Sequence, residues 1–184
     1  MIEKEREVKI LGIDLEAFEA LLIEKGATLR LFEQQLNLIF SPPALYGTDS
    51  YLRIRTTKNL ESGEEKSVLT LKINEGQEGV RTNREYTTPV EDAEVMSEIL
   101  CLSGLREPVE AQKIRKSYLL RGAVIDLDKW SESVYPEPYA EIEVSSEEKL
   151  EEILHLLSID PEQVSTRSIR QLMHDVRKRE DTDA

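Results

Sequence analysis

The feature that most constrains the fold is an alternation in which like-charged side chains occupy every second position of short segments. Five segments show it, at Glu5 and Glu7, Arg53 and Arg55, Lys113 and Arg115, Asp126 and Asp128, and Glu141 and Glu143. Aliphatic residues fill most of the positions in between, as Leu52 and Ile54 do. Because successive side chains of a β-strand point to opposite faces, each segment predicts a strand with one charged and one apolar face.

The rest of the pattern predicts an α+β arrangement of about eight antiparallel strands and a few amphipathic helices. The expected strands cover residues 5–10, 29–40, 51–55, 68–73, 84–89, 113–120, 124–129 and 139–144. The expected helices cover residues 15–25, 91–102, about 148–157, and 166–179. Asp14 is the expected N-cap of the first helix, and Ser145 with Glu148 forms the expected capping box of the third.

Composition limits the class of protein. With 184 residues, 39% apolar and 33% charged, the chain is expected to form one domain over residues 1–179 and a polar tail at 180–184. No apolar run approaches the roughly 20 residues that cross a bilayer, so we expect no membrane partner. The net charge of −13 argues against nucleic acid as a partner. The single cysteine, Cys101, lies in an apolar helical run, so we expect a buried structural thiol and a cytoplasmic location.

The charged strand faces must point either to bulk water or toward one another. A solvated edge strand would account for Glu5, Glu7 and Lys9 taken alone. The five segments together group charges of one sign, whereas water-facing sheets usually avoid like-charged neighbours. We therefore expect a closed barrel with a polar, charged interior, in which a bound polyanion and a divalent cation offset the repulsion. A triphosphate suits such a cavity, because arginine side chains match its oxygens in a bidentate manner.

With these residues the chain resembles the CYTH superfamily, also called triphosphate tunnel metalloenzymes. This superfamily includes class IV adenylyl cyclases, thiamine triphosphatases and inorganic triphosphatases. The resemblance covers about residues 1–172. The matching positions are Glu5, Glu7 and Lys9 (Glu-x-Glu-x-Lys), Arg53 and Arg55 (Arg-x-Arg), Lys72, Glu85, Lys113 and Arg115 (Lys-x-Arg), Asp128, Glu141 and Glu143 (Glu-x-Glu), and Arg167.

The resemblance implies an eight-stranded antiparallel tunnel, flanked by helices, that binds a triphosphate together with Mg²⁺ or Mn²⁺. It assigns the metal to Glu5, Glu7, Glu85, Asp128, Glu141 and Glu143. It assigns the triphosphate to Lys9, Arg53, Arg55, Lys72, Lys113, Arg115 and Arg167. The expected catalytic residues are Glu5, Glu7, Lys9 and Lys72.

Some positions depart from the family pattern. Asn37 and Thr87 stand where acidic residues are common, and Arg167, with Arg170 nearby, stands where lysine is common. Residues 128–141 are most similar to the branch labelled class IV adenylyl cyclase-like, a label that does not by itself establish cyclisation.

Three functions remain open on the sequence alone. The leading one is metal-dependent hydrolysis of tripolyphosphate, thiamine triphosphate or ATP. Cyclisation of ATP to cyclic AMP and pyrophosphate, and non-catalytic binding of polyphosphate or nucleotide, are the alternatives, and a homodimer is a further expectation. Two interpretations of Trp130 are open, that it lies at the rim of an opening or that it packs, and we favour packing. We expect His155 and His174 to be surface or packing residues rather than ligands.

Overall fold

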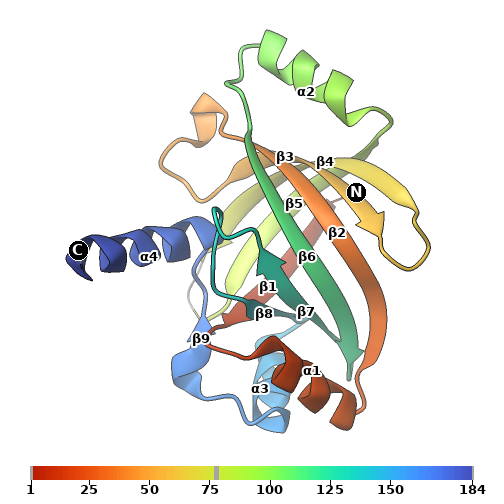
Figure 1. Ribbon diagram of the computed structural model, residues 1–184, viewed down its shortest axis with the longest axis vertical. Coiled ribbons are helices and arrows are strands. Elements are labelled where there is room, and N and C mark those ends of the chain that lie inside the picture. Colours follow the sequence, from red (N-terminus) through yellow and green to blue (C-terminus); the bar gives the residue numbers. More distant parts are fainter. Residues whose placement is uncertain (1, 77–78, 184) are drawn as a thin grey trace.

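The computed structural model describes residues 2–76 and 79–183, and it consists of a sheet curled into a barrel with helices around it (Figure 1). The strands are β1 (Ile2–Ile10), β2 (Thr28–Phe40), β3 (Tyr51–Asn59), β4 (Glu65–Gly76), β5 (Arg81–Val90), β6 (Val109–Leu120), β7 (Ala123–Trp130), β8 (Tyr139–Glu143) and β9 (Val164–Ser165). The helices are α1 (Leu15–Glu24), α2 (Ala93–Leu102), α3 (Glu147–Leu156) and α4 (Ile169–Asp183), with 3₁₀ turns at Pro43–Leu45 and Pro161–Gln163. The eight predicted strands and four predicted helices are all present, and the short β9 was not predicted.

Strand pairing closes the sheet on itself. The order is β5-β4-β3-β2-β6-β7-β8-β1, and β1 also pairs with β5. All pairings are antiparallel, and β9 adds a short pairing at the end of β1. Closure directs one face of every strand inward and leaves the eight barrel strands without a free edge. The predicted fold, an α+β antiparallel barrel flanked by helices, is confirmed.

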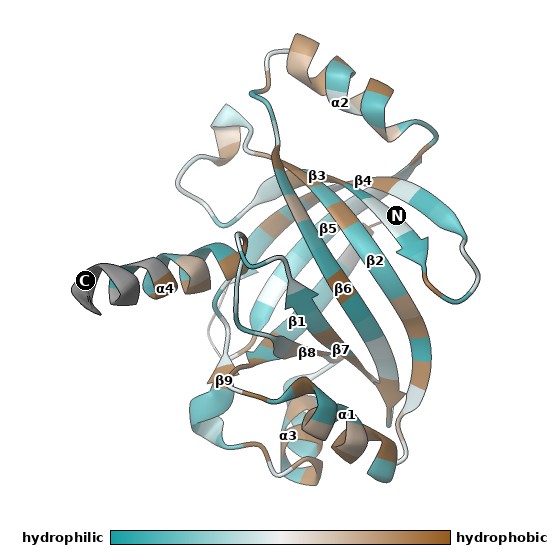
Figure 2. Ribbon diagram, in the orientation of Figure 1, coloured by the Kyte–Doolittle hydropathy of each residue, from teal (hydrophilic) through white to brown (hydrophobic). Residues whose placement is uncertain are grey.

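The main apolar core lies outside the barrel, between the outer faces of β1, β6, β7 and β8 and helices α1 and α3. Its sheet side consists of the aliphatic residues that alternate with the charged ones, among them Val8, Ile10, Ile125, Leu127, Ala140 and Ile142. Phe18 and Leu22 of α1 and Leu150 and Ile153 of α3 pack against them. Figure 2 shows the alternation of hydrophilic and hydrophobic residues along β2 and β6. Because each such buried side chain contributes about 1.5–3 kcal/mol, this core stabilises the fold around a charged interior.

Helix starts were predicted with mixed accuracy. The Asp14 carboxylate accepts a hydrogen bond from the Ala17 backbone N–H at 2.8 Å, so the expected cap of α1 is confirmed. The expected cap of α3 is wrong by one residue, because Ser146 accepts from the backbone N–H of Lys149. Helix α4 begins at Ile169, later than expected, and it continues through residues 180–183, which we had expected to form a tail.

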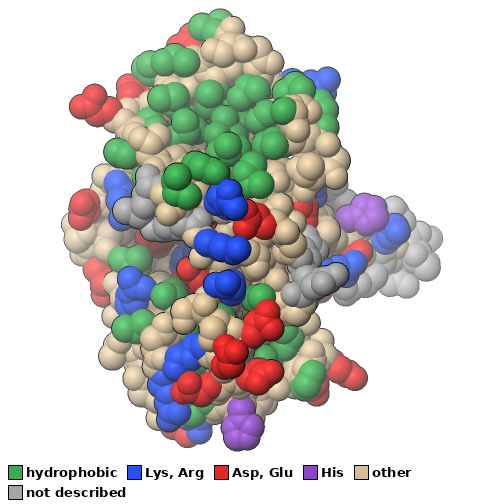
Figure 3. Space-filling view, turned by 180° about the vertical axis from the view of Figure 1, so that it is seen from behind, with side chains coloured by type: hydrophobic (Ala, Val, Ile, Leu, Met, Phe, Trp, Pro, Cys, Tyr) green, Lys and Arg blue, Asp and Glu red, His purple; other side chains and the backbone are tan. Residues whose placement is uncertain are grey.

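Helix α2 covers the barrel poorly. It buries none of its residues, and Val95, Ile99 and Leu102 expose 51%, 50% and 82% of their surface. Figure 3 shows hydrophobic side chains gathered over the upper part of the molecule, where α2 lies. The expectation of a buried Cys101 is wrong, since its thiol is only half-buried on a helix beyond the end of the barrel. No helix in the described ranges is both long and apolar enough to span a bilayer.

Candidate active site

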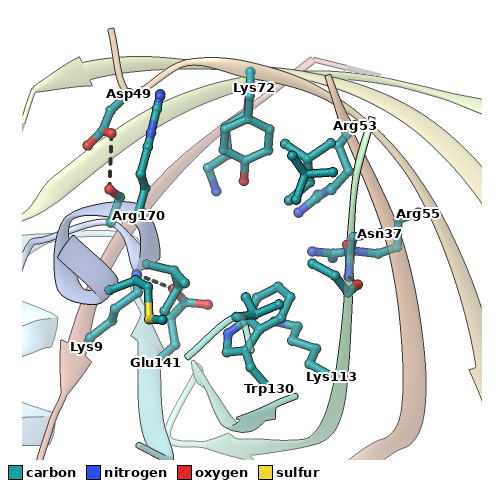
Figure 4. A pocket seen from close by; sticks show the side chains of 18 of the residues that line it. Lys9, Asn37, Asp49, Arg53, Arg55, Lys72, Lys113, Trp130, Glu141 and Arg170 are labelled. Atoms are coloured by element: carbon teal, nitrogen blue, oxygen red, sulfur yellow. Dashed lines mark hydrogen bonds and ion pairs between the residues drawn. The ribbon is translucent and has the colours of Figure 1, made fainter. Parts of the chain in front are cut away.

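The barrel encloses a cavity of about 850 Å³ whose wall receives side chains from all eight barrel strands. Eleven of the predicted site residues line it: Glu5, Glu7, Lys9, Arg53, Arg55, Lys72, Glu85, Lys113, Arg115, Glu141 and Glu143. Figure 4 shows how such residues converge on one open space from strands that are far apart in the sequence. The expected inward orientation of the charged strand faces is therefore present.

The acidic wall of the cavity is formed by β1 and β8, with one residue of β7. Strand pairing sets Glu7 opposite Glu143, so carboxylates from neighbouring strands face each other. Burial, followed by repulsion from Glu5 and Asp126, raises the pKa of Glu143 to about 7. Burial likewise raises the pKa of Glu5. The acidic wall therefore carries more negative charge than its surroundings neutralise.

These carboxylates suit a hard divalent cation. Asp126 Oδ1 is buried and has no hydrogen-bond partner among the described residues, so it remains available as an oxygen ligand. Glu143, Glu5 and Glu7 would add the other oxygen ligands. No three acidic, histidine or cysteine side chains in residues 2–76 and 79–183 already form a metal site. Glu5 also contacts Lys72, and the two other expected metal ligands on the cavity wall, Glu85 and Glu141, contact Lys72 and Lys9.

Lys9 and Lys72 are the cations embedded in the acidic wall. Lys9 Nζ lies 2.7 Å from Glu141 Oε1, while Lys72 Nζ lies 2.7 Å from Glu5 Oε2 and 2.9 Å from Glu85 Oε1. Burial alone would lower the pKa of both amines, but attraction to Glu141 and Glu7 raises the pKa of Lys9, and attraction to Glu7, Glu5 and Glu85 takes that of Lys72 well above its usual value. Both lysines therefore stay charged at neutral pH and point into the cavity (Figure 4).

The basic wall is formed by β3 and β6. Burial, with repulsion from Arg53 and Arg115, lowers the pKa of Arg55 to about 10. Burial and repulsion from Arg115 lower the pKa of Lys113 to about 7. Arg53 Nε is buried without a hydrogen-bond partner among the described residues. These cations repel one another in a buried place, which an anion would relieve.

Asn37 is one of the residues that depart from the pattern of the family that the sequence resembles. Its Oδ1 accepts a hydrogen bond from Arg55 Nε at 2.9 Å, and its Nδ2 donates to the Ala111 carbonyl at 3.2 Å. The amide thus orients Arg55 without neutralising it. The guanidinium charge of Arg55 stays available to an anion.

Asp128, an expected metal ligand, does not line the cavity. It is fully buried and accepts hydrogen bonds from Lys113 Nζ at 2.6 Å, Arg115 Nε at 2.7 Å and the Tyr139 hydroxyl at 3.1 Å. Burial would raise its pKa, but Arg115 and Lys113 lower it. Asp128 therefore positions two cations of the basic wall, and Asp126 is the β7 carboxylate that faces the cavity.

Arg167, an expected triphosphate ligand, also lies outside the cavity wall. Its side chain is half-exposed and pairs with Asp175 on α4. Helix α4 starts two residues after Arg167, and Arg170 in its first turn lines the cavity instead (Figure 4). The basic residue near the C-terminus is thus displaced by three positions from the predicted one.

The sequence interpretation missed a buried arginine and its partners. Arg81, 2% exposed, places Nε 3.5 Å from Glu7 Oε1 and Nη1 3.2 Å from Asp49 Oδ2. Asn83 Nδ2 donates to Glu7 Oε1 at 3.0 Å. The Ser168 hydroxyl donates to Asp49 Oδ1 at 3.1 Å, which ties the start of α4 to this group. The alternation of Arg81, Asn83 and Glu85 could have identified these residues as sharing one strand face. We did not recognise it because we expected the strand to begin at residue 84.

Trp130 and His174 also line the cavity, whereas we expected a packing residue and a surface or packing residue. Trp130 packs as well, because Ile169 and Met173 belong to the same apolar cluster beside Tyr139. The side chain of His174 is 67% exposed, which places it at the edge of the cavity. His155 is exposed on α3, in agreement with the prediction.

Comparison with known proteins agrees with this architecture. The family model for the CYTH domain matches residues 3–169. The PH1819 protein from Pyrococcus horikoshii OT3 is 24% identical, with a TM-score of 0.77 over 93% of this chain and 98% of that one. A candidate adenylate cyclase from Vibrio parahaemolyticus is 16% identical, with a TM-score of 0.71 over 94% and 98%.

HpAC1 from Hippeastrum, described as having a dominant triphosphatase activity, is 21% identical, with a TM-score of 0.61 over 90% of this chain and 91% of that one. At these identities the solved structures support the fold alone. No curated protein matches the chain. The family model covers nearly the whole sequence, and the chain belongs to the CYTH domain family.

Proposed function

We propose that this chain is a triphosphatase that depends on Mg²⁺ or Mn²⁺ and hydrolyses the terminal phosphate of a triphosphate substrate. The observation that carries the proposal is that the two facing walls of the cavity are unbalanced in charge, one with excess negative charge and the other with excess positive charge. Burial, with repulsion from Glu5 and Asp126, raises the pKa of Glu143 to about 7, and burial, with repulsion from Arg115, lowers that of Lys113 to about 7. A metal ion relieves the first imbalance and a polyphosphate relieves the second.

The roles follow from the contacts described above. Glu5, Glu7, Asp126 and Glu143 would hold the metal ion, which when bound supplies Lewis acidity toward phosphate oxygens and lowers the pKa of water. Arg53, Arg55, Lys113 and Arg115 bind the phosphate oxygens from the opposite side. Their charge stabilises the transition state, in which negative charge spreads over the transferring phosphoryl group.

The residues of β1 and β4 act where the chemistry takes place. Lys9 and Lys72 bring positive charge close to the carboxylates, so a phosphate chain can approach that wall without net repulsion. The Glu5 or Glu7 carboxylate orients the attacking water by accepting its hydrogen bond. The protein forms no covalent bond to the substrate in this scheme; it positions the groups and neutralises charge.

The direct test is a product assay. The purified protein is incubated with tripolyphosphate, thiamine triphosphate or ATP, each with Mg²⁺ or Mn²⁺, and phosphate, pyrophosphate and cyclic AMP are measured. We expect phosphate release that a chelator abolishes. Cyclic AMP with pyrophosphate would replace the proposal by cyclisation, and tight binding without any product would replace it by a binding module.

A matched pair of variants makes this assay specific to the cavity. Lys9→Ala is expected to lower kcat/KM by about 100-fold or more, the usual cost of losing one charged contact to the transition state. Lys4→Ala is the control, since Lys4 lies on the same strand with a side chain that is 53% exposed and paired with Glu75. Equal rates for the two variants would contradict the assignment of the cavity as the active site.

A further inference from the structure

The carboxylate of Glu7, an expected metal ligand, is held mainly by two side chains of β5. Its Oε1 accepts a hydrogen bond from Asn83 Nδ2 at 3.0 Å and lies 3.5 Å from Arg81 Nε. The lysine amines lie farther from the carboxylate, at 3.9 Å for Lys9 and 3.7 Å for Lys72. The orientation of the Glu7 carboxylate therefore depends on the β5 side chains.

Arg81 depends in turn on Asp49, in the loop between β2 and β3. Its Nη1 donates to Asp49 Oδ2 at 3.2 Å, and its Nη2 donates to the Asp49 backbone carbonyl at 3.5 Å. Because the arginine is almost fully buried, bulk water does not readily replace either contact, and loss of Asp49 would leave a buried cation with fewer partners. Asp49 thus fixes the guanidinium that contacts Glu7.

Ser168, immediately before α4, joins Asp49 to that helix. Its hydroxyl donates to Asp49 Oδ1 at 3.1 Å, the dashed line at Asp49 in Figure 4, and accepts from the Gln171 backbone N–H at 3.2 Å. The Ser168 N–H donates to Gln171 Oε1 at 2.8 Å, which completes a capping box. A carboxylate at this end of a helix also interacts favourably with the helix dipole. The same hydroxyl therefore caps α4 and ties it to the loop.

These contacts form a chain that we call the relay, made of Glu7, Arg81, Asp49 and Ser168. The relay joins β1, β5, the loop between β2 and β3, and the start of α4, which are far apart in the sequence. At one end lies an expected metal ligand. At the other end, Arg170 in the first turn of α4 lines the cavity (Figure 4). The relay therefore connects a metal ligand with a cation that is available to phosphates.

The relay lets its two ends stabilise each other. When the first turn of α4 frays, Asp49 loses the Ser168 hydroxyl and its side chain gains freedom to rotate. Arg81 then loses its fixed partner, so the Glu7 carboxylate spends less time in one orientation. A cation that binds the fixed carboxylate therefore binds more tightly when α4 is docked, and by linkage it favours the docked form to the same extent.

We propose, on the basis of the metal-dependent function above, that Asp49 is a positioning residue that couples the docking of α4 to divalent-cation binding at Glu7. With the helix docked, Arg170 is in place before the phosphates bind. Asn83 keeps its own hydrogen bond to Glu7 when the relay is broken, so we expect a moderate coupling of about fivefold, near the low end of the usual range.

The first test is amide hydrogen exchange of the native protein with and without saturating Mn²⁺. The Leu172 N–H donates to the Ser168 carbonyl at 3.0 Å and reports the docking of α4. The Leu150 N–H donates to the Ser146 carbonyl at 3.2 Å at the start of α3 and is the matched control. We expect Mn²⁺ to slow exchange at Leu172 about fivefold more than at Leu150. Equal slowing at the two amides would overturn the proposal.

Asp49→Asn tests the central link of the relay. The amide oxygen can still accept from the Ser168 hydroxyl, but the charge that holds Arg81 is lost. We expect Mn²⁺ to bind about fivefold more weakly by calorimetry and to lose its selective effect on exchange at Leu172. Asp14→Asn, which removes the same charge at the N-cap of α1, is the control and should leave both measurements unchanged. If Mn²⁺ still protects Leu172 selectively in Asp49→Asn, Asp49 is not the link and the proposal fails.

Ser168→Asp separates the relay from a simple effect of charge. Aspartate is as good an N-cap as serine, so α4 keeps its cap, but the new carboxylate repels Asp49. Added negative charge near the cavity would by itself tighten Mn²⁺ binding, whereas a broken relay weakens it. We expect binding about threefold weaker by calorimetry, and Ser146→Asp at the start of α3 should leave the affinity unchanged. Equal or tighter binding by Ser168→Asp would overturn the proposal.

The two proposals fail in different ways. If the native protein does not bind Mn²⁺, both the metal-dependent function and the coupling are overturned. If Mn²⁺ binds and phosphate is released, but exchange at Leu172 and Leu150 responds alike, only the coupling is overturned.

Discussion

The acidic and basic walls of the cavity are built on the same plan with the signs reversed. Each contains a buried counter-ion: Asp128 holds Lys113 and Arg115 of the basic wall, and Arg81 contacts Glu7 of the acidic wall. In neither wall is the compensation complete, as the opposite pKa shifts of Lys113 and Glu143 indicate. The comparison indicates that the counter-ions position the side chains of each wall without neutralising them fully. Each wall therefore keeps a residual charge for a ligand of the opposite sign.

Arg115 is the side chain that joins the two walls, so its loss should have the largest effect. It pairs with Asp126, Asp128 and Glu141. Arg115→Ala removes the cation paired with Asp126 and leaves Asp128 and Glu141 with only Lys113 and Lys9, so it is expected to lower the free energy of unfolding by about 3–5 kcal/mol. Urea denaturation measures this loss in the free energy of unfolding. The adjacent Lys116→Ala removes an outward pair with Glu19 and should cost about 1 kcal/mol or less, so equal losses would contradict the assignment.

The contributions of the two walls to the stability of the fold should change with pH in opposite directions. The folded state raises the pKa of Glu143 from 4.5 to about 7, so it binds more protons there than the unfolded state, and this contribution to stability falls as pH rises from 4.5 to 7. The folded state lowers the pKa of Lys113 from 10.5 to about 7, so its contribution recovers as pH rises from 7 to 10.5.

Single substitutions separate these two slopes. In the metal-free protein, Glu143→Gln should flatten the acidic limb of the stability profile, and Lys113→Met should flatten the alkaline limb. Each change is on the order of 2 kcal/mol across its window, after allowance for solvent screening of Glu143. Thermal denaturation at a series of pH values measures both. If each variant altered the other limb, the two pKa assignments would be wrong.

Arg81 tests whether a counter-ion positions the acidic wall. Arg81→Gln breaks the contacts with Glu7 and Asp49 and should lower the free energy of unfolding by about 2 kcal/mol. It should also speed amide hydrogen exchange in the first turn of α4, which depends on Asp49 through Ser168. Arg84→Gln, on the same strand with a half-exposed side chain, is the control and should change stability by less than about 0.5 kcal/mol. Unaltered exchange in α4 would show that Arg81 does not hold the helix.

The smallest expected effect concerns the charge left on the basic wall. Asn37→Asp would place a carboxylate beside Arg55 and neutralise the guanidinium charge that would otherwise attract a bound anion. We expect tripolyphosphate to bind about threefold to tenfold more weakly, or about 1 kcal/mol, by calorimetry. Asn59→Asp at the far end of β3, where the amide caps a turn, is the control. Tighter binding by Asn37→Asp would show that Arg55 does not contact the anion.

Much of this site could be predicted because alternation in a strand fixes the face of each residue. The pairs Arg53 and Arg55, and Glu141 and Glu143, needed no tertiary information to be placed on one face. The alternation could not distinguish Asp128, the expected metal ligand, from Asp126, because both satisfy it. Only the register, which sets Arg115 opposite Asp128, decides which of them is buried among cations.

Other parts depended on features that a single sequence does not encode locally. Arg167 was identified from its resemblance to the family pattern, with Arg170 nearby, and only the start of α4 at Ile169 decides that Arg170 is the one that lines the cavity. The burial expected for Cys101 failed because an apolar helix pattern shows which face is apolar, but not whether a sheet lies beneath it.

The closing strand has a consequence for the order of events during synthesis. β1 is made before both of its long partners, β5 and β8, which follow much later in the sequence, and Glu7 pairs with Arg81 and Glu143. Nascent chains that lack β8 can therefore assemble the β2–β6 part of the barrel but not the wall that carries Glu5, Glu7 and Lys9. Such long-range closure slows folding: β5 can pair with one edge of β1, but the other edge stays unpaired until β8 has been made.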